Sequence, residues 1–302
     1  MKLLVIGGSY FLGKHFVTMA CKEHEVTVYN RGNMPLSDMP VEQLLGDRHD
    51  ADALRQLAKG NYDVVVDFCA YEAGDIAAVF EALSSPCKQY IFISTVDVYE
   101  RGLDRFLDEN APFETRDFGG QEGAYILGKV SLEQEIVSCC RKYGARYTTF
   151  RPAILYGPDN YAPREGIYFH WISQAGQILH PVDATGEFQF AYVEDVARAI
   201  LRAIGNEKAY DEAFNLAEGT LETYESFADA LAKVVSKPFE KVSIPVAQVI
   251  SQGIPLPFPL TREESNRYDG TKALALIGAY QSLEEGLIKT MPKYDNISQN
   301  MI

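Results

Sequence analysis

Short apolar runs alternate with amphipathic segments along the first third of the chain. Runs that are apolar throughout are typical of strands buried on both faces of a parallel sheet. Residues 3–6 form such a run, and further strand-like segments lie at residues 25–29, 41–45, 62–70 and 89–95. Helical patterns lie between them, in the run that ends at Cys21 and at residues 51–58 and 75–83. This alternation predicts an α/β fold with a doubly wound parallel sheet.

A glycine-bearing turn, Gly7-Gly8-Ser9-Tyr10-Phe11-Leu12-Gly13, follows the first strand. A strand, a glycine turn and a helix form the context of a dinucleotide fingerprint, in which Gly7 permits the tight turn and Gly13 close helix packing. Free N–H groups at the helix start would bind a pyrophosphate. Tyr10 stands where the middle glycine belongs, so the pyrophosphate path is expected to differ. We favour a Rossmann-type cofactor turn over an ordinary strand–helix turn, with cofactor contacts from Gly7, Ser9, Tyr10, Phe11, Leu12 and Gly13.

The second strand ends at Asn30-Arg31-Gly32, where an NAD enzyme has a carboxylate for the ribose hydroxyls. Arg31 could instead pair with a 2′-phosphate, which favours NADP over NAD, although a solvated loop arginine is an equally good interpretation. After the third strand, Asp47 could accept a hydrogen bond from the adenine amino group. Asn30 and Arg48 complete the predicted contacts at this end.

Polar residues stand at the ends of the next two strands. Because ligands bind at the carboxyl ends of strands in open α/β sheets, Ala70 and Ser94 are expected beside the cofactor. Thr95 could hydrogen-bond the reacting oxygen of a substrate, and Asp97 is a candidate substrate contact. The alternatives are a strand-end cap for Thr95 and a solvated loop carboxylate for Asp97.

Tyr125-Ile126-Leu127-Gly128-Lys129 places a tyrosine four residues before a lysine. On the helix that residues 130–137 suggest, both side chains share one face. A free phenol has a pKa of about 10. A nearby ammonium and an oxidised nicotinamide would favour the phenolate, so Tyr125 could move a proton while the cofactor moves a hydride. Alone, the spacing is equally compatible with a pair on a helix surface.

Composition narrows the class of protein. The 302 residues are 47% hydrophobic, enough for a large α/β domain with an added lobe. The net charge of −14 disfavours non-specific binding to nucleic acid or anionic membranes. The expected partner is a small-molecule substrate, and neither nucleic acid nor a membrane is expected to bind. A homodimer is left open. Five cysteines without C-x-x-C spacing or a ligand cluster predict reduced thiols in a cytoplasmic protein without a metal site.

Motifs in this order resemble an extended short-chain dehydrogenase/reductase of the NAD-dependent epimerase/dehydratase type. They are Gly7-Gly8-x-x-x-x-Gly13, Thr95 four residues before Tyr99, Tyr125-x-x-x-Lys129, Arg151-Pro152-Ala153-Ile154-Leu155-Tyr156-Gly157-Pro158, Ala191-Tyr192-Val193-Glu194-Asp195 and Phe214-Asn215-Leu216-Ala217. The resemblance covers residues 1–217 and, faintly, 269–272. It implies that Thr95, Tyr125 and Lys129 form the catalytic set. Lys129 would also hold the nicotinamide ribose, and Pro152 and Ile154 would border the nicotinamide.

The chain departs from this family pattern in two places. No arginine occurs in residues 186–192, where many nucleotide-sugar members have one, and Val96 follows Thr95, where dehydratases begin an acidic pair. These departures disfavour sugar-nucleotide dehydration and put UDP-sugar epimerisation in doubt. The turn at residues 7–13 and Asn30-Arg31-Gly32 resemble an atypical branch that includes chloroplast stem-loop RNA-binding proteins, in which the fold serves binding.

The expected organisation is a dinucleotide-binding domain at residues 1–155 with 188–217, and a smaller C-terminal substrate lobe at 156–187 with 218–302. The aromatic segment after Pro158, together with Arg164, is expected to line the substrate cleft, although lobe core is the better interpretation of Phe169 and Trp171. Tyr192 is a further substrate candidate. A final helical segment is expected at residues 272–289, followed by a frayed tail at 290–302. The expected function is an NAD(P)-dependent oxidoreductase or epimerase acting on a hydroxyl/carbonyl centre of a sugar or nucleotide-sugar derivative. The alternative is a non-catalytic RNA- or cofactor-binding module.

Overall fold

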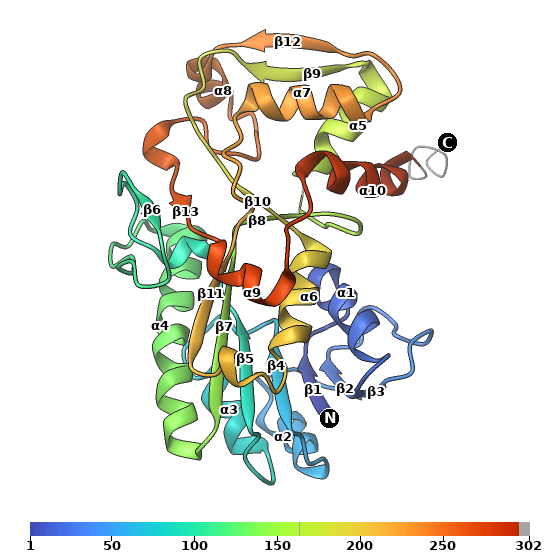
Figure 1. Cartoon of the computed structure of the whole chain (residues 1–302), viewed down its shortest axis with the longest axis vertical. Helices are drawn as coiled ribbons and strands as arrows, with labels where there is room; N and C mark the ends of the chain where they lie inside the picture. The colour runs from blue at the N-terminus through green and yellow to red at the C-terminus, as the bar shows by residue number, and fades with distance from the viewer. Residues whose placement is uncertain (163, 296–302) are drawn as a thin grey trace.

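A computed structural model describes residues 1–162 and 164–295 and is built around one seven-stranded sheet (Figure 1). The strand order is β11-β7-β5-β4-β1-β2-β3, and every neighbouring pair is parallel. Chain order reverses between β1 and β4, which makes this the topological switch point of a doubly wound sheet. The predicted fold class is therefore confirmed. The strands are β1 Lys2–Ile6, β2 Glu25–Asn30, β3 Glu42–Leu45, β4 Val64–Asp67, β5 Gln89–Ile93, β7 Arg146–Pro152 and β11 Glu212–Leu216.

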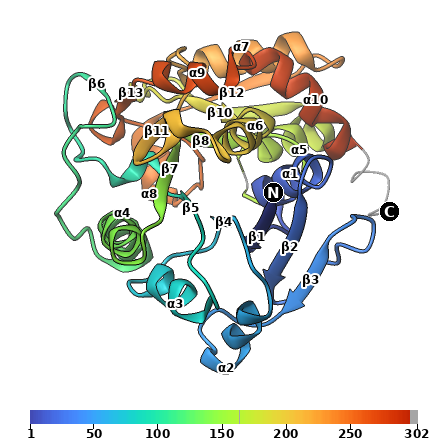
Figure 2. The ribbon, with the colours of Figure 1, turned by 60° about the horizontal axis from the view of Figure 1, so that its bottom comes forward.

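Helices cover both faces of this sheet (Figure 2). Leu3 and Val5 of β1 belong to an apolar cluster with helices α1 (Phe11–Ala20) and α6 (Val193–Ala203). Leu4 and Ile6 belong to a second cluster, which includes residues of α3 (Asp75–Ala82) and α4 (Gly120–Tyr143). Both faces of the central strands are thus buried, and this is the physical reason for their continuous apolar sequence.

The rest of the described chain lies mainly beyond the carboxyl ends of these strands (Figure 1). Three short parallel pairs occur there, β8 with β10, β9 with β12 and β6 with β13. The predicted division into two domains stays a prediction. The bounds are β6 Phe106–Leu107, β8 Ile154–Tyr156, β9 Gln177–Pro181, β10 Phe190–Tyr192, β12 Glu240–Ile244, β13 Arg267–Tyr268, α2 Ala51–Leu54, α5 Glu165–Ala175, α7 Tyr224–Val234, α8 Val246–Gln252, α9 Leu274–Ile277 and α10 Leu283–Asp295.

Two predicted segments differ from the structure. The helix expected at 272–289 is broken, because Gly278 ends α9 with a φ of +80° and α10 starts only at Leu283. The frayed tail expected at 290–302 is wrong for its first residues, since α10 continues to Asp295 and Thr290 is fully buried. Residues 296–302 lie outside the described part of the chain.

A buried ion pair anchors helix α4 to the sheet. Arg151 of β7 donates to both carboxylate oxygens of Glu133 on α4, at 2.8 and 2.9 Å, and both side chains are about 4% exposed. The same guanidinium donates to the Tyr99 hydroxyl at 2.7 Å. This network fixes the position of the helix that carries Tyr125 and Lys129.

No described helix is long and apolar enough to cross a membrane. All five cysteines are free thiols in the structure.

Candidate active site

A cavity of about 1090 Å³ opens at the carboxyl ends of the sheet strands. Its lining includes residues that follow β1, β2, β3, β4 and β5, and also Pro152 at the end of β7. This is where open α/β sheets bind their ligands. Of the predicted cofactor and catalytic residues, those that line the cavity are Gly7, Ser9, Tyr10, Phe11, Leu12, Gly13, Asn30, Arg31, Asp47, Arg48, Ser94, Thr95, Tyr125, Lys129, Pro152 and Ile154.

The glycine turn has the backbone that its sequence predicts. Gly7 and Gly8 have φ values of +95° and +80°, which side-chain-bearing residues rarely adopt. A Cβ on Gly13 would lie 2.7 Å from the Cα of Gly8, so glycine is required for helix α1 to approach the turn. Tyr10, at the position of the middle glycine, precedes α1 in an extended conformation and is 52% exposed. Tyr10 and the first residues of α1 both line the cavity.

Of the two arginines at the predicted adenosine end, Arg31 is exposed and Arg48 is paired with a carboxylate. Arg31 is exposed and lines the cavity, whereas Asn30 accepts hydrogen bonds from the Gly32 N–H and from the Gln43 side chain, each at 2.9 Å. Arg48 donates to both carboxylate oxygens of Asp67 at 2.9 and 3.1 Å. Only 8% of its side chain is exposed. Arg48 therefore forms part of the cavity wall with its charge already paired, and Arg31 is the better candidate for a phosphate.

The predicted catalytic side chains meet at the carboxyl end of β5. The Thr95 hydroxyl hydrogen-bonds the Tyr125 phenol, an interaction that lowers the pKa of Tyr125. Thr95 also donates to the Asp97 carboxylate at 3.0 Å and accepts from the Asp97 N–H at 3.2 Å. Thr95 therefore caps the turn after β5 and also lines the cavity, and its role toward a substrate stays a prediction. Because Thr95 has a single hydroxyl proton, Asp97 and Tyr125 compete for it.

Lys129 lies one helical turn after Tyr125 and is almost fully buried. Its Nζ donates to the carbonyls of Ala70 and Ile93, at 2.8 and 2.9 Å, and lies 5.9 Å from the centre of the Tyr125 ring. Burial lowers the pKa of Lys129 to about 8. The two carbonyls fix the ammonium between the ends of β4 and β5 and leave its third proton available, because an ammonium has three donors. Ala70 acts here through its carbonyl, and its side chain does not line the cavity.

The protein raises the pKa of Tyr125 to about 12. The largest cause is loss of solvent around the phenol, with 37% of the residue still exposed, and the Asp97 carboxylate is the second. The net direction is opposite to the one expected from Lys129, because loss of solvent outweighs the neighbouring positive charges. In the protein alone, Tyr125 is therefore a protonated phenol at neutral pH.

Replacing Asp97 by asparagine should lower the pKa of Tyr125. The substitution removes a negative charge that opposes the phenolate, and it leaves the Thr95 proton free for the phenol. If alcohol oxidation requires the phenolate, the rising limb of kcat/KM against pH should move to lower pH in Asp97→Asn. Asp104→Asn is the matched control, because Asp104 is 88% exposed and lies outside the cavity lining. An unchanged limb, or a shift to higher pH, would contradict the assigned role of Asp97.

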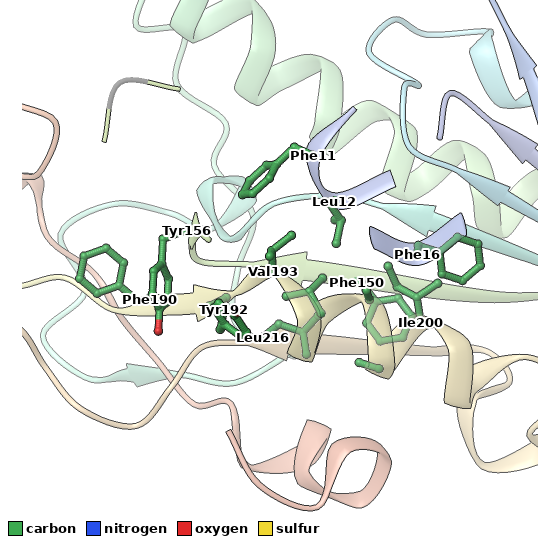
Figure 3. Close-up of a cluster of buried hydrophobic side chains, with 14 of the residues drawn as sticks. Phe11, Leu12, Phe16, Phe150, Tyr156, Phe190, Tyr192, Val193, Ile200 and Leu216 are labelled. Carbon is green, nitrogen blue, oxygen red and sulfur yellow. The ribbon is translucent and has the colours of Figure 1, made fainter. Parts of the chain in front are cut away.

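The predicted substrate residues separate into two groups. Asp97 and Arg164 line the cavity, and Arg164 donates to the Leu155 carbonyl at 2.8 Å. Tyr192 does not line it: the side chain is 2% exposed and packs against Tyr156 in the apolar cluster (Figure 3). The substrate role predicted for Tyr192 is therefore corrected, since this tyrosine is core.

Of the aromatic residues after Pro158, one lines the cavity and others pack in the core. Tyr161 is 71% exposed, lines the cavity and makes an edge contact with Tyr10, with ring centres 6.0 Å apart. Tyr168, Phe169 and Trp171 pack in the apolar core instead.

Tyr71, which with Ala70 was expected to end the strand at residues 62–70 beside the cofactor, lines the cavity, and its ring centre lies 6.3 Å from that of Tyr125. Other cavity residues were not identified from the sequence. The segment at residues 256–259 and the pair Asn266 and Tyr268 close the far side of the cavity. No local pattern marks these, because long-range pairing of β13 with β6 brings them there.

Two features of the cavity lining fit a nicotinamide dinucleotide. Ser94 is buried and lines the cavity, and its hydroxyl has no hydrogen-bond partner in the described part of the chain. A buried hydroxyl of this kind is normally satisfied, so it points to a ligand that supplies the partner. The glycine turn and the start of α1 would hold the pyrophosphate. The described residues contain no group of three or more His, Cys, Asp or Glu side chains that could hold a metal ion.

Comparison with known proteins gives a match to a family model and matches to curated relatives. The model of the "NAD dependent epimerase/dehydratase family" matches residues 3–217. Among curated relatives, the "chloroplast stem-loop binding protein of 41 kDa b" of Arabidopsis thaliana is 32% identical over 253 residues, which cover 78% of this chain and 64% of that protein. UDP-glucose 4-epimerase of Vibrio cholerae is 23% identical, over 58% of this chain and 52% of that protein. The chain therefore spans less than two thirds of the length of these relatives.

Solved structures share the fold. UDP-glucose 4-epimerase of Thermotoga maritima, solved with UDP-glucose, superposes with a TM-score of 0.79 at 22% identity, covering 99% of this chain and 100% of that one. UDP-glucuronic acid 4-epimerase of Bacillus cereus, solved with UDP-glucuronic acid and NAD, gives 0.77 at 18% identity, covering 98% and 100%. At these identities, the similarity establishes the fold alone.

Proposed function

Because the chain belongs to the NAD dependent epimerase/dehydratase family, we propose that it is an NAD(P)-dependent oxidoreductase or epimerase. The substrate would carry a hydroxyl or carbonyl centre, plausibly on a sugar derivative. The observation that carries this proposal is the meeting of Thr95, Tyr125 and Lys129 in one cavity at the switch edge of the sheet. These three groups supply an acid/base, a hydroxyl that orients it and a fixed positive charge.

Each side chain has a definable task in this reaction. A bound nicotinamide would accept the hydride from the substrate carbon. Tyr125 takes the proton from the substrate hydroxyl when it is ionised, and returns that proton when the reaction runs toward the alcohol. The Thr95 hydroxyl would hydrogen-bond both the phenol and the reacting oxygen, and Lys129 would donate its remaining N–H to a ribose hydroxyl.

NADP is the proposed cofactor, because Arg31 stands at the end of β2 without a neighbouring carboxylate that would hold a ribose. Arg31→Ala should weaken NADPH binding by about 1.5–3 kcal/mol, the contribution of a charge-assisted hydrogen bond, and should leave NADH binding nearly unchanged. Titration of cofactor fluorescence measures both affinities. Arg55→Ala is the control, because Arg55 is an exposed arginine that does not line the cavity. A wild-type preference for NADH, or equal losses for both cofactors, would contradict this proposal.

Binding of a stem-loop RNA is the second candidate function. The specific observation in its favour is the 32% identity to a protein named as a stem-loop binding protein, which weighs against the expectation that nucleic acid is no partner. The net charge of −14 weighs the other way, because phosphate contacts need a local excess of Lys and Arg. That relative is named as chloroplastic, so the predicted cytoplasmic location stays a prediction.

One purified preparation can separate the two candidates. Mass spectrometry of the protein as isolated identifies a retained cofactor, and gel shift with a stem-loop RNA at physiological salt measures nucleic-acid affinity. The enzyme proposal expects NADP(H) or NAD(H) binding and only weak RNA binding. Submicromolar, salt-sensitive RNA binding without any cofactor affinity would favour the second candidate and refute the first.

A further inference from the structure

The lining residues from Val96 onward, apart from Tyr125, Lys129, Pro152 and Ile154, are here called the substrate end. Its charged lining residues are four carboxylates and two guanidiniums: Asp97, Glu122, Glu187 and Glu264, with Arg101 and Arg164. Arg262 and Arg267 pair with Glu187 from outside the lining, at 3.7 and 2.9 Å, so four guanidiniums accompany the four carboxylates. A ligand that brings two further negative charges would therefore meet no net positive charge at this end.

The guanidiniums near the substrate end are already engaged. Arg101 pairs with Glu122 and lies over the Phe118 ring. Arg267, behind the lining, pairs with Glu187 at 2.9 Å. Arg164 donates to the Leu155 carbonyl, and its charge is opposed by the adjacent buried Glu165. The described residues therefore present no cluster of cations that could bind a diphosphate without breaking existing pairs.

Hydrogen-bond acceptors at this end remain available. Asn266 is buried and lines the cavity, and its side-chain oxygen has no hydrogen-bond partner among residues 1–162 and 164–295, while its amide nitrogen donates to the Glu100 carbonyl at 3.3 Å. Asp97 is exposed to the cavity, and within residues 1–162 and 164–295 it forms no ion pair. Asp97, Asn266 and Tyr268 all line the cavity, and the Asp97 carboxylate contributes to raising the pKa of Tyr268, after burial. A buried unpaired acceptor is satisfied by a hydroxyl or an ammonium of a ligand, and not by a phosphate oxygen.

We propose that the substrate end takes a free polyol, preferentially one that carries an amine, and not a nucleotide-diphosphate sugar. The inference rests on the proposed oxidoreductase or epimerase function and names its substrate class. The polyol hydroxyls would donate to Asn266, an ammonium would pair with Asp97, and the apolar segment Leu256-Pro257-Phe258-Pro259 would cover the C–H face of the ring. Tyr125 and Thr95 would then face the hydroxyl to be oxidised.

Calorimetry on the full chain saturated with NADPH tests this assignment with three probes: glucosamine with its amine protonated, glucose, and UDP-glucose. Glucosamine should bind roughly five- to tenfold more tightly than glucose, the ratio for a charge-assisted against a neutral hydrogen bond. UDP-glucose should bind more weakly than either. Tighter binding of UDP-glucose would overturn the inference. Binding of NADPH with no binding of glucose or glucosamine would overturn it too, and would leave the proposed function standing. A protein that does not bind NADP(H) or NAD(H) would refute both.

Two carboxylate variants localise the effect. Asp97→Asn should reduce the preference for glucosamine over glucose to about onefold, because the pairing charge is lost and the side-chain size is kept. Asp104→Asn removes an exposed carboxylate outside the cavity lining and should retain the wild-type ratio. Full retention of the preference in Asp97→Asn, or its equal loss in both variants, would overturn the assignment of the amine to Asp97.

Discussion

Tyr125→Phe should slow the chemical step by about 100- to 10,000-fold, the typical contribution of general acid–base catalysis. The substitution removes the hydroxyl that hydrogen-bonds Thr95 and keeps the aromatic ring beside Tyr71. The fold and the affinity for the cofactor should therefore survive. Single-turnover absorbance of the nicotinamide, with a substrate that the wild type accepts, measures this step, and a cofactor titration runs beside it.

Tyr161→Phe is the matched control for this variant. Tyr161 also lines the cavity and is 71% exposed, but it lies in the segment that contacts the glycine turn. Its loss of a hydroxyl should change the rate of the chemical step by less than about tenfold. If Tyr125→Phe turns over nearly as fast as the wild type, or if both variants are equally slow, Tyr125 is not the acid/base of this site.

Arg151→Met should destabilise the protein by about 3–5 kcal/mol, because it leaves the buried Glu133 carboxylate without its partner. The same arginine also donates to the Tyr99 hydroxyl, so two buried acceptors lose a donor. The melting temperature should fall by on the order of 10 °C. Calorimetric or circular-dichroism melting measures the change. Helix α4 is anchored through this pair, so the catalytic rate at low temperature should fall as well.

Arg146→Met provides the comparison on the same strand. Arg146 pairs with Asp211 at the surface, where both side chains are about half exposed. An exposed pair contributes about 0–1 kcal/mol, so the melting temperature should move by only a few degrees. Equal shifts in the two variants would contradict the argument that burial, and not pairing alone, determines the cost.

The sequence alone determined the sheet and the strand ends that carry the chemistry. Leu3-Leu4-Val5-Ile6 is apolar on both faces, and both faces prove to be buried. Gly13 was expected to allow close helix packing, and a Cβ there would collide with Gly8. The spacing from Tyr125 to Lys129 likewise set both side chains on one face of α4. These features are local, so propensity, periodicity and backbone restrictions suffice to predict them.

The tertiary structure alone decided which candidate residues line the cavity, which of them are paired, and how their pKa values are shifted. Tyr192 and Arg48 carry polar groups in promising positions, but one is core and the other is paired with Asp67. The Tyr125 pKa is raised, although its motif suggested the opposite, because desolvation depends on neighbours from distant segments. Asn266 reaches the cavity through the pairing of β13 with β6, some 160 residues apart in sequence. Burial, charge pairing and long-range strand contacts are properties of the folded chain, and no local pattern encodes them.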